Sequence, residues 1–131
     1  MPPKSTSSPP RPTDAELAIL QVIWARGPGT VREILEGVNE YRKPALAYTT
    51  VLRFLQIMTD KGLVQREDGE RGHVYRPSVP AQKTKRQLVG DLLHRVFEGS
   101  VRELVLQALG SKKVSAADVR EIRKLLDEMA P

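Results

Sequence analysis

The clearest hydrophobic pattern of the chain lies between Tyr48 and Gly62. Its apolar positions recur at the spacing of one helical face, at Val51, Phe54, Leu55 and Met58. Another side of the same stretch is polar and carries Thr49, Thr50, Arg53 and Gln56. Three consecutive β-branched residues near its start disfavour a helix locally, but the long stripe and the glycine that follows it favour one. The pattern predicts an amphipathic helix over residues 48–61.

Two shorter helices are predicted upstream, and each opens with a capping box, in which a hydroxyl and a carboxylate satisfy backbone N–H groups. The two boxes are Thr13 with Glu16 and Thr30 with Glu33. The predicted buried stripe of the first helix is Leu17, Leu20, Ile23 and Trp24, and the helix closes at Gly27-Pro28. The second buries Val31, Ile34, Leu35 and Val38 and runs out near Tyr41. Residues 42–47 then form a connection.

After Gly62 the hydrophobic period changes from that of a helix to that of strands. Two short strands are predicted, over residues 62–67 and 73–77. The Asp68-Gly69 pair indicates a tight connection over residues 68–72. Three helices followed by a hairpin is the winged-helix arrangement. The hairpin would bring Arg66, Arg71 and His73 beside the third helix.

Beyond Pro77 the pattern becomes helical again, over residues 81–98, over residues 101–110 and in a last helix that opens with Ser115 and Asp118. These roughly fifty residues are too few to build a core of their own, so a second copy of the chain is the simplest cover for their apolar stripes. The predicted dimer contacts are Leu88, Leu92, Val96, Leu104, Leu106, Val119, Ile122 and Leu126. The predicted organisation is a disordered Pro/Ser-rich tail (1–12), a winged-helix domain (13–79) and a helical dimerisation region (80–131).

The distribution of charge says more than the net charge of +5. Residues 13–41 carry two basic and five acidic side chains, whereas residues 42–76 carry seven basic and four acidic ones. An acidic first part followed by a basic second part suits a domain of which only the second part faces a polyanion. An ordinary mixed surface is the alternative interpretation.

The chain lacks the sequence signatures of several classes of protein. It contains no cysteine, which excludes disulfides and thiolate metal sites. There is no run of 18 apolar residues and no signal-peptide core, so we expect a cytoplasmic protein without a membrane span. Its two histidines, His73 and His94, lie in different modules, and no nucleophile motif or phosphate loop occurs. The sequence therefore predicts no enzyme, no cofactor and no metal.

Several weaker signals favour binding to double-stranded DNA. The second helix of a helix-turn-helix enters the major groove with its N-terminal residues on base edges. Arginine can pair with guanine and threonine can contact a base, while the basic residues of the wing contact phosphate. The predicted DNA-binding residues are Lys43, Tyr48, Thr49, Thr50, Arg53, Gln56, Arg66, Arg71 and His73. Alternatively, Thr49 and Thr50 cap a core helix and the arginines are surface solubilisers.

A rival function is that of a protein-interaction module that does not bind specific DNA sequences. Leu52 and Ile57 are apolar but lie outside the main stripe of their helix, and together they could form a binding patch. Packing of these two residues against the first helices or the wing is the structural alternative.

Three segments of the chain resemble the penicillinase-repressor family, the BlaI/MecI/CopY-type winged-helix transcriptional repressors. They are TDAELAILQVIWARGPGTVREI, AYTTVLRFLQIMTDKGLVQRE and the final VREIRKLLDEM, and the resemblance covers about residues 13–129. It implies a homodimer that binds a palindromic operator and represses transcription. It also implies that the recognition helix is residues 48–61 and that the dimer helices follow Pro80.

Two features of this family are missing from the chain. The β-lactam-responsive members are cut by a sensor protease at an Asn-Phe bond, and Gln107 and Ala108 stand in the corresponding place. The copper-responsive members use a C-terminal cysteine cluster, and this chain has no cysteine. The resemblance therefore supports neither a sensor protease as a partner nor copper as a signal.

Overall fold

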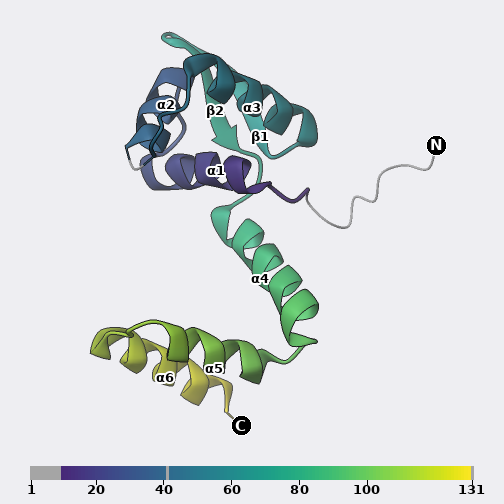
Figure 1. Ribbon diagram of the computed structural model, residues 1–131, viewed down its shortest axis with the longest axis vertical. Coiled ribbons are helices and arrows are strands. Elements are labelled where there is room, and N and C mark those ends of the chain that lie inside the picture. Colours follow the sequence, from purple (N-terminus) through teal and green to yellow (C-terminus); the bar gives the residue numbers. More distant parts are fainter. Residues whose placement is uncertain (1–9, 41, 131) are drawn as a thin grey trace, which may run out of the picture. The chain divides into compact units, whose positions relative to one another are not determined.

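The computed structural model describes residues 10–40 and 42–130 (Figure 1). The elements in chain order are α1 (Asp14–Arg26), α2 (Val31–Asn39), α3 (Tyr48–Lys61), β1 (Val64–Gly69), β2 (Gly72–Pro77), α4 (Ala81–Phe97), α5 (Val101–Ser111) and α6 (Ala116–Met129). The predicted mainly helical chain with one small hairpin is confirmed. Most of the predicted disordered tail, residues 1–9, lies outside the described residues. Among the described helices, none is long and apolar enough to cross a membrane.

The chain divides into two compact units, one ending at Leu88 and the other beginning at Val89. The division falls inside α4, not at the predicted boundary between residues 79 and 80. The start of α4 belongs to the first unit because Thr84 is buried there. In addition, the Lys85 Nζ lies 5.5 Å from the centroid of the Trp24 ring.

Both predicted capping boxes are present in the first unit. The Glu16 carboxylate accepts a hydrogen bond from the Thr13 backbone at 2.9 Å, and Glu33 accepts the equivalent bond from Thr30 at 2.9 Å. In return, each threonine hydroxyl accepts from the backbone N–H of its glutamate. These local bonds explain why α1 and α2 begin where the sequence predicts. The bounds of α3 also match the prediction, and Gly62 ends it in the left-handed conformation, at φ 84°.

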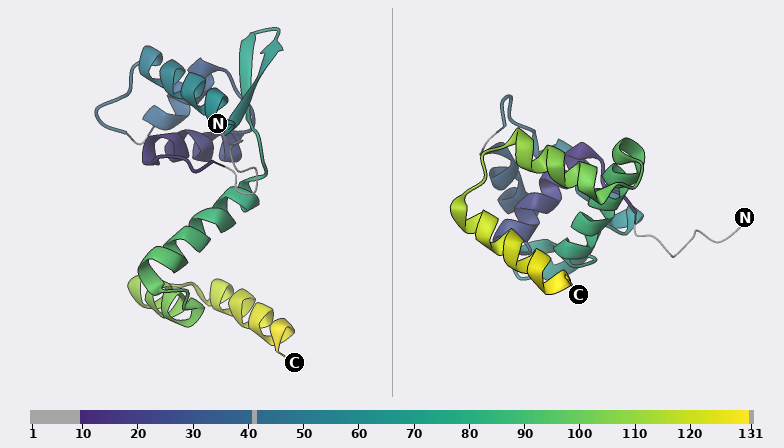
Figure 2. Two further views of the ribbon diagram at one scale, coloured as in Figure 1. Left: turned by 90° about the vertical axis from the view of Figure 1, so that its right-hand side faces the viewer. Right: turned by 90° about the horizontal axis from the view of Figure 1, so that it is seen from below.

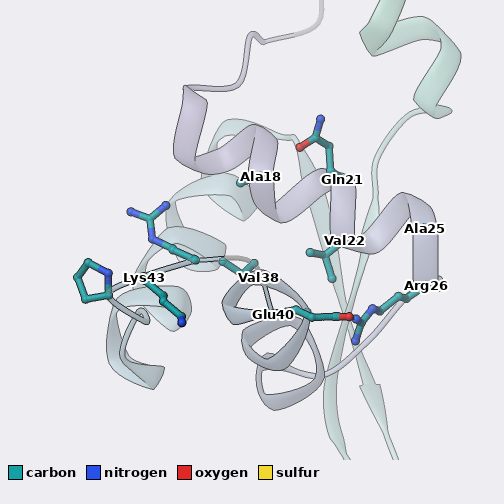
Figure 3. Close-up of a pocket in the computed structure, with 11 residues that line it drawn as sticks. Ala18, Gln21, Val22, Ala25, Arg26, Val38, Glu40 and Lys43 are labelled. Carbon is teal, nitrogen blue, oxygen red and sulfur yellow. The ribbon is translucent and has the colours of Figure 1, made fainter.

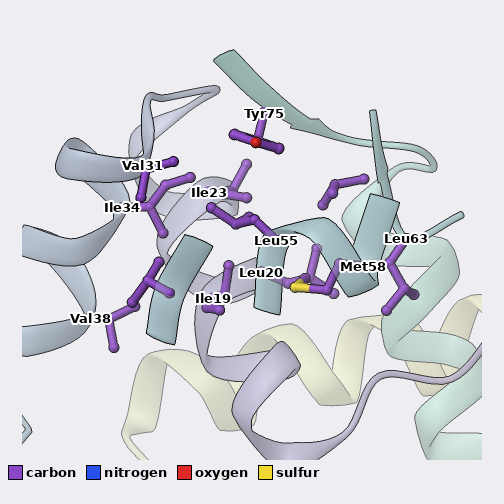
Figure 4. Close-up of a cluster of buried hydrophobic side chains, with 12 residues drawn as sticks. Ile19, Leu20, Ile23, Val31, Ile34, Val38, Leu55, Met58, Leu63 and Tyr75 are labelled. Carbon is purple, nitrogen blue, oxygen red and sulfur yellow. The ribbon is translucent and has the colours of Figure 1, made fainter. Parts of the chain in front are cut away.

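The core of the first unit forms where α1, α2, α3 and the hairpin meet (Figure 4). From α3, Val51, Leu55 and Met58 are fully buried, as predicted, whereas Phe54 is half-buried and packs against the core. The stripe predicted for α1 was partly wrong. Leu17 and Trp24 are half-buried, and Ile19 takes a buried place instead. Since α1 is apolar around much of its circumference, periodicity alone does not specify the side that α2 and α3 cover.

A glycine allows α1 and α2 to pack closely. Gly37 is buried in α2, and a Cβ atom at this position would lie 2.5 Å from the Val22 Cγ1 on α1. That distance is shorter than van der Waals contact, so any other residue requires the Val22 side chain or one of the helices to shift. The third helix, α3, packs against this pair of helices.

The hairpin is an antiparallel pair of strands, seen as a two-stranded ribbon at the edge of the first unit (Figure 2). The predicted turn was misplaced: Gly69 pairs with Gly72, so the connection is Glu70-Arg71, and Asp68 belongs to β1. Gly72, at φ 110°, supplies the backbone conformation that closes this connection. A feature that sequence patterns did not indicate is the bridge between Gly29 and Tyr75, whose backbones exchange hydrogen bonds of 3.2 and 2.8 Å. This bridge ties β2 to the connection between α1 and α2.

In the monomer, the apolar side chains of the second unit are exposed or only half-buried. No residue of α5 or α6 is buried. Of the predicted dimer contacts, four are exposed and four are half-buried. The exposed ones are Leu92, Val96, Leu106 and Leu126, and the half-buried ones are Leu88, Leu104, Val119 and Ile122. Monomers rarely expose so many large apolar side chains on so few residues.

Candidate nucleic-acid interface

The outer side of α3 presents the polar residues that the sequence singled out. Thr49 and Arg53 are exposed and Thr50 is half-buried, while the inner side of the helix is fully covered by the core. These three side chains, with Phe54 and Ile57, line a shallow hollow of about 590 Å³. The N-cap of α3 is Ala47, which makes no side-chain cap hydrogen bond. Thr49 and Thr50 therefore do not act as the N-cap, and their hydroxyls lie within the first turn.

A second group of predicted residues lines a groove between the start of α2, the side of α3 and the wing. This groove has a volume of about 720 Å³. The predicted residues that it brings together are Tyr48, Gln56, Arg66, Arg71 and His73. The structure thus places the wing residues beside the third helix, as their position on the hairpin predicted.

Lys43 is separated from the other predicted residues. It lines a different groove, between α1 and the end of α2, together with Arg42 and the ion pair of Arg26 with Glu40 (Figure 3). Of the nine predicted residues, it is the one that lines neither the hollow on α3 nor the groove beside the wing.

Carboxylates of the first unit already contact two of the predicted wing residues. Arg71 donates to the Glu33 carboxylate at 3.2 Å, and His73 lies 2.8 Å from the Asp68 carboxylate. The pKa of Glu33 lies below its usual value, first because the Thr30 backbone and hydroxyl donate to its carboxylate and then because Arg71 is near. Arg53 and Arg66 have no ion-pair partner among the described residues. Their guanidinium groups are therefore available to a ligand without first breaking such a pair.

The entry to α3 is set by a side chain on α2. Asn39 donates to the carbonyl of Leu46 at 3.0 Å and accepts from the backbone N–H of Leu46 at 2.8 Å. Leu46 directly precedes the N-cap Ala47. These paired bonds fix the end of the 42–47 connection, whose direction could not be read from sequence spacing.

The other end of α3 is held by an ion pair with α1. The Lys61 Nζ lies 2.6 Å from the Glu16 Oε1, and Glu16 is 2% exposed. Burial by itself raises the pKa of Glu16, but the hydrogen bonds from Lys61 and Thr13 outweigh burial and bring the pKa below its usual value. Glu16 therefore completes the capping box of α1 and also holds the C-terminal turn of α3.

We expect Glu16→Gln to lower the free energy of unfolding at pH 7 by about 1–2 kcal/mol, toward the lower end of the range of about 1.5–3 kcal/mol for a hydrogen bond to a charged group, because Lys61 is partly exposed. Glutamine keeps the capping box but loses the charge facing Lys61, which is 32% exposed and can be rehydrated. Since the folded pKa of Glu16 is lowered, its stabilisation is present above the usual pKa and is lost as pH falls through the folded value. Urea unfolding at pH 7, 5 and 3 measures this difference.

The matched control for this substitution is Glu36→Gln, at an exposed glutamate of α2. It should change the unfolding free energy little at any of the three pH values. A difference between wild type and Glu16→Gln that stayed constant from pH 7 to pH 3 would rule out the ion pair as its source.

One residue that lines the groove beside the wing was missed in the sequence. The Arg32 Cζ lies 5.6 Å from the centroid of the Tyr48 ring, and both residues line this groove. The signal that could have indicated it is a cation in the first turn of a helix, where the helix dipole disfavours positive charge.

Of the two residues predicted to form a protein-binding patch, only one is exposed. Leu52 is half-buried and packs against the core, whereas Ile57 is 39% exposed. The packing alternative therefore holds for Leu52.

Comparison with known proteins gives consistent matches over nearly the whole chain. The family profile described as penicillinase repressor matches residues 12–128. The chain is 24% identical to a penicillinase repressor of Bacillus licheniformis over 121 residues, covering 91% of each protein. It is 31% identical to the transcriptional regulator BlaI of Mycobacterium tuberculosis over 117 residues, covering 88% of this chain and 83% of the relative.

A solved structure with a similar fold is the solution structure of the monomeric form of B. licheniformis BlaI in complex with the blaP half-operator. The TM-score is 0.50 at 22% identity, and the match covers 58% of this chain and 90% of the other. At this identity the likeness concerns the fold, which here is the winged-helix arrangement of three helices followed by a hairpin. Because the family profile spans nearly all of the sequence, the chain belongs to the penicillinase repressor family.

Proposed function

We propose that this protein is a homodimeric transcriptional repressor that binds a palindromic DNA operator through α3. The observation that carries the proposal is the position of Thr49, Thr50 and Arg53 on the outer side of a helix whose inner side is buried. A groove lined by three further arginines lies beside the same helix. The relatives named as repressors, and the related protein studied with half of an operator, point in the same direction.

The two surfaces of the first unit have different roles in this proposal. Arg53 pairs with a guanine in the major groove, and Thr49 and Thr50 contact neighbouring bases. Arg66, Arg71 and His73 of the wing contact backbone phosphates, which orient the protein without reading sequence. Arg71 exchanges the Glu33 carboxylate for a phosphate when DNA binds.

A second copy of the chain is the proposed cover for the apolar side chains of α4, α5 and α6. Exposed leucines and valines of these helices form the same patch on both subunits, and the two patches face each other across a two-fold axis. Dimer symmetry then places two recognition helices on two half-sites, which makes the operator palindromic.

A mobility-shift assay tests DNA binding directly. The full-length protein should shift a fragment of the DNA upstream of its own gene at low salt and in the presence of competitor DNA. Failure to shift any promoter fragment at low salt would favour the protein-interaction function, for which Ile57 is the remaining exposed apolar residue on α3.

We expect Arg53→Ala to weaken operator binding by about 1–3 kcal/mol and to relax sequence preference at the position that Arg53 reads. Arg66→Ala is the matched comparison, because it removes the same side chain from the wing and should weaken operator and random DNA by similar factors. Competition binding with an operator duplex and a random duplex of equal length measures both effects. If Arg53→Ala weakened the two duplexes equally, Arg53 would be a phosphate contact and not a base contact.

A further inference from the structure

We propose that Arg32 binds a backbone phosphate of the operator and, through its stacking on Tyr48, positions the first turn of the recognition helix. This inference rests on the proposed function and adds a contact from α2, an element to which no DNA contact was assigned above. It concerns the groove bounded by α2, α3 and the wing.

The location of Arg32 is electrostatically unfavourable for the fold itself. Arg32 is exposed and follows Val31, the first residue of α2, so its charge lies at the positive end of the helix dipole. Thr30 and Glu33 of the capping box already accept hydrogen bonds from backbone N–H groups at the start of this helix. The helix dipole therefore disfavours a cation here, whereas the cation does add to an anion-binding surface.

The guanidinium of Arg32 is not engaged by the carboxylates around it. Glu33 and Glu36 line the same groove, but Glu33 accepts from Thr30 and pairs with Arg71. No ion pair of Arg32 occurs among the described residues. Its contact is with an aromatic ring, since its Cζ lies 5.6 Å from the centroid of Tyr48. An arginine stacked on a ring keeps its N–H edges free to donate.

The arrangement suits a DNA strand rather than a small anion. Arg32, Arg66 and Arg71 come from α2, β1 and the turn of the wing, and all line one open groove of about 720 Å³. An extended polyanion can engage all three in succession, as successive phosphates do along a DNA backbone. Tyr48 is 42% exposed and is the first residue of α3, so the stacked arginine fixes the end of the helix that enters the major groove.

Arg32 thus has two separable properties: its charge acts on any DNA, and the contact of its guanidinium with the Tyr48 ring acts on the operator. Arg32→Ala removes both, whereas Arg32→Lys keeps the charge and loses the planar fork. We expect Arg32→Ala to weaken operator and random DNA and to reduce the slope of log K against log salt by about 1 per protomer. We expect Arg32→Lys to keep the salt slope and the binding to random DNA, while its operator preference falls by about two- to fivefold.

The measurement is a competition titration of the full-length variants at four salt concentrations, on a footprinted operator and on a random duplex of equal length. Arg120→Ala is the control, since it removes an exposed arginine of α6 and should leave the slope unchanged. Wild-type binding with an unchanged slope for Arg32→Ala would overturn the role of Arg32 and leave the proposed function intact. Equal operator preference in Arg32→Lys and wild type would overturn the positioning role. Absence of wild-type binding to any duplex would instead contradict the proposed function.

Discussion

Operator binding by this protein is expected to weaken by about three to four orders of magnitude when salt is raised from 50 to 200 mM. The estimate assumes that each protomer neutralises three or four phosphates, which gives a slope of log K against log salt of roughly −5 to −7 for a dimer. Arg66 and Arg71 of the wing and Arg32 of α2 line the groove that would supply most of these contacts. Titration of a labelled operator at five salt concentrations gives the slope directly.

Two controls make the salt dependence interpretable. Sedimentation at both ends of the salt range must show the same assembly state, so that the slope reports release of counterions and not dissociation of subunits. Arg66→Ala should make the slope shallower, because it removes one cation from the groove in each protomer. A flat response to salt would contradict a surface that binds the DNA backbone.

Combining Val96→Asp with Leu126→Asp is expected to turn the proposed dimer into a monomer and to lower operator affinity by about 10²–10⁴-fold. Val96 and Leu126 are 60% and 57% exposed in the monomer, where an aspartate is hydrated at little cost. At a subunit interface the same aspartates lose their water without gaining a partner. A monomer also loses the high effective concentration of its second recognition helix. Sedimentation velocity and operator titration measure the two consequences.

The matched control for this double variant is Ala117→Asp. Ala117 is exposed in the first turn of α6, where negative charge suits the helix dipole, so the dimer should persist. Binding of the double variant to an isolated half-site should remain near that of wild type, since the first unit is unchanged. A double variant that stayed dimeric would place the interface elsewhere on the chain.

The helix boundaries could be read from the sequence because the signals that set them are local. Thr13 with Glu16 and Thr30 with Glu33 satisfy each other's backbone groups across three residues, whatever surrounds them. Gly62 ends α3 because its backbone adopts a left-handed conformation that other residues disfavour. The hairpin was also predictable, but its turn was not, since the Asp68-Gly69 signal competes with the register that pairs Gly69 with Gly72.

The candidate site was predicted as a list of residues, and only the fold divided that list among surfaces. Thr49, Thr50 and Arg53 share the outer side of α3, because residues separated by three or four positions lie on one side of a helix. The groove containing Arg66 and Arg71 depends on how the wing packs beside α3, and Lys43 lies outside it because its connection runs past α1. The angle at which helices cross and the packing of the wing cannot be derived from the spacing of residues along a single helix or strand.

By itself, the sequence determined which segments are helical, where they begin, and that one polar-sided helix is followed by a basic hairpin. Only the tertiary structure decided which side of α1 is buried and which partners hold α3 in place. The contact of Lys61 with Glu16 joins positions 45 residues apart, and the stack of Arg32 on Tyr48 joins two helices. Such contacts depend on the rotation and crossing of packed helices, which local propensity and periodicity do not specify. The sequence thus determined the extent and the polar side of α3, and the packing around that helix decided which residues position it.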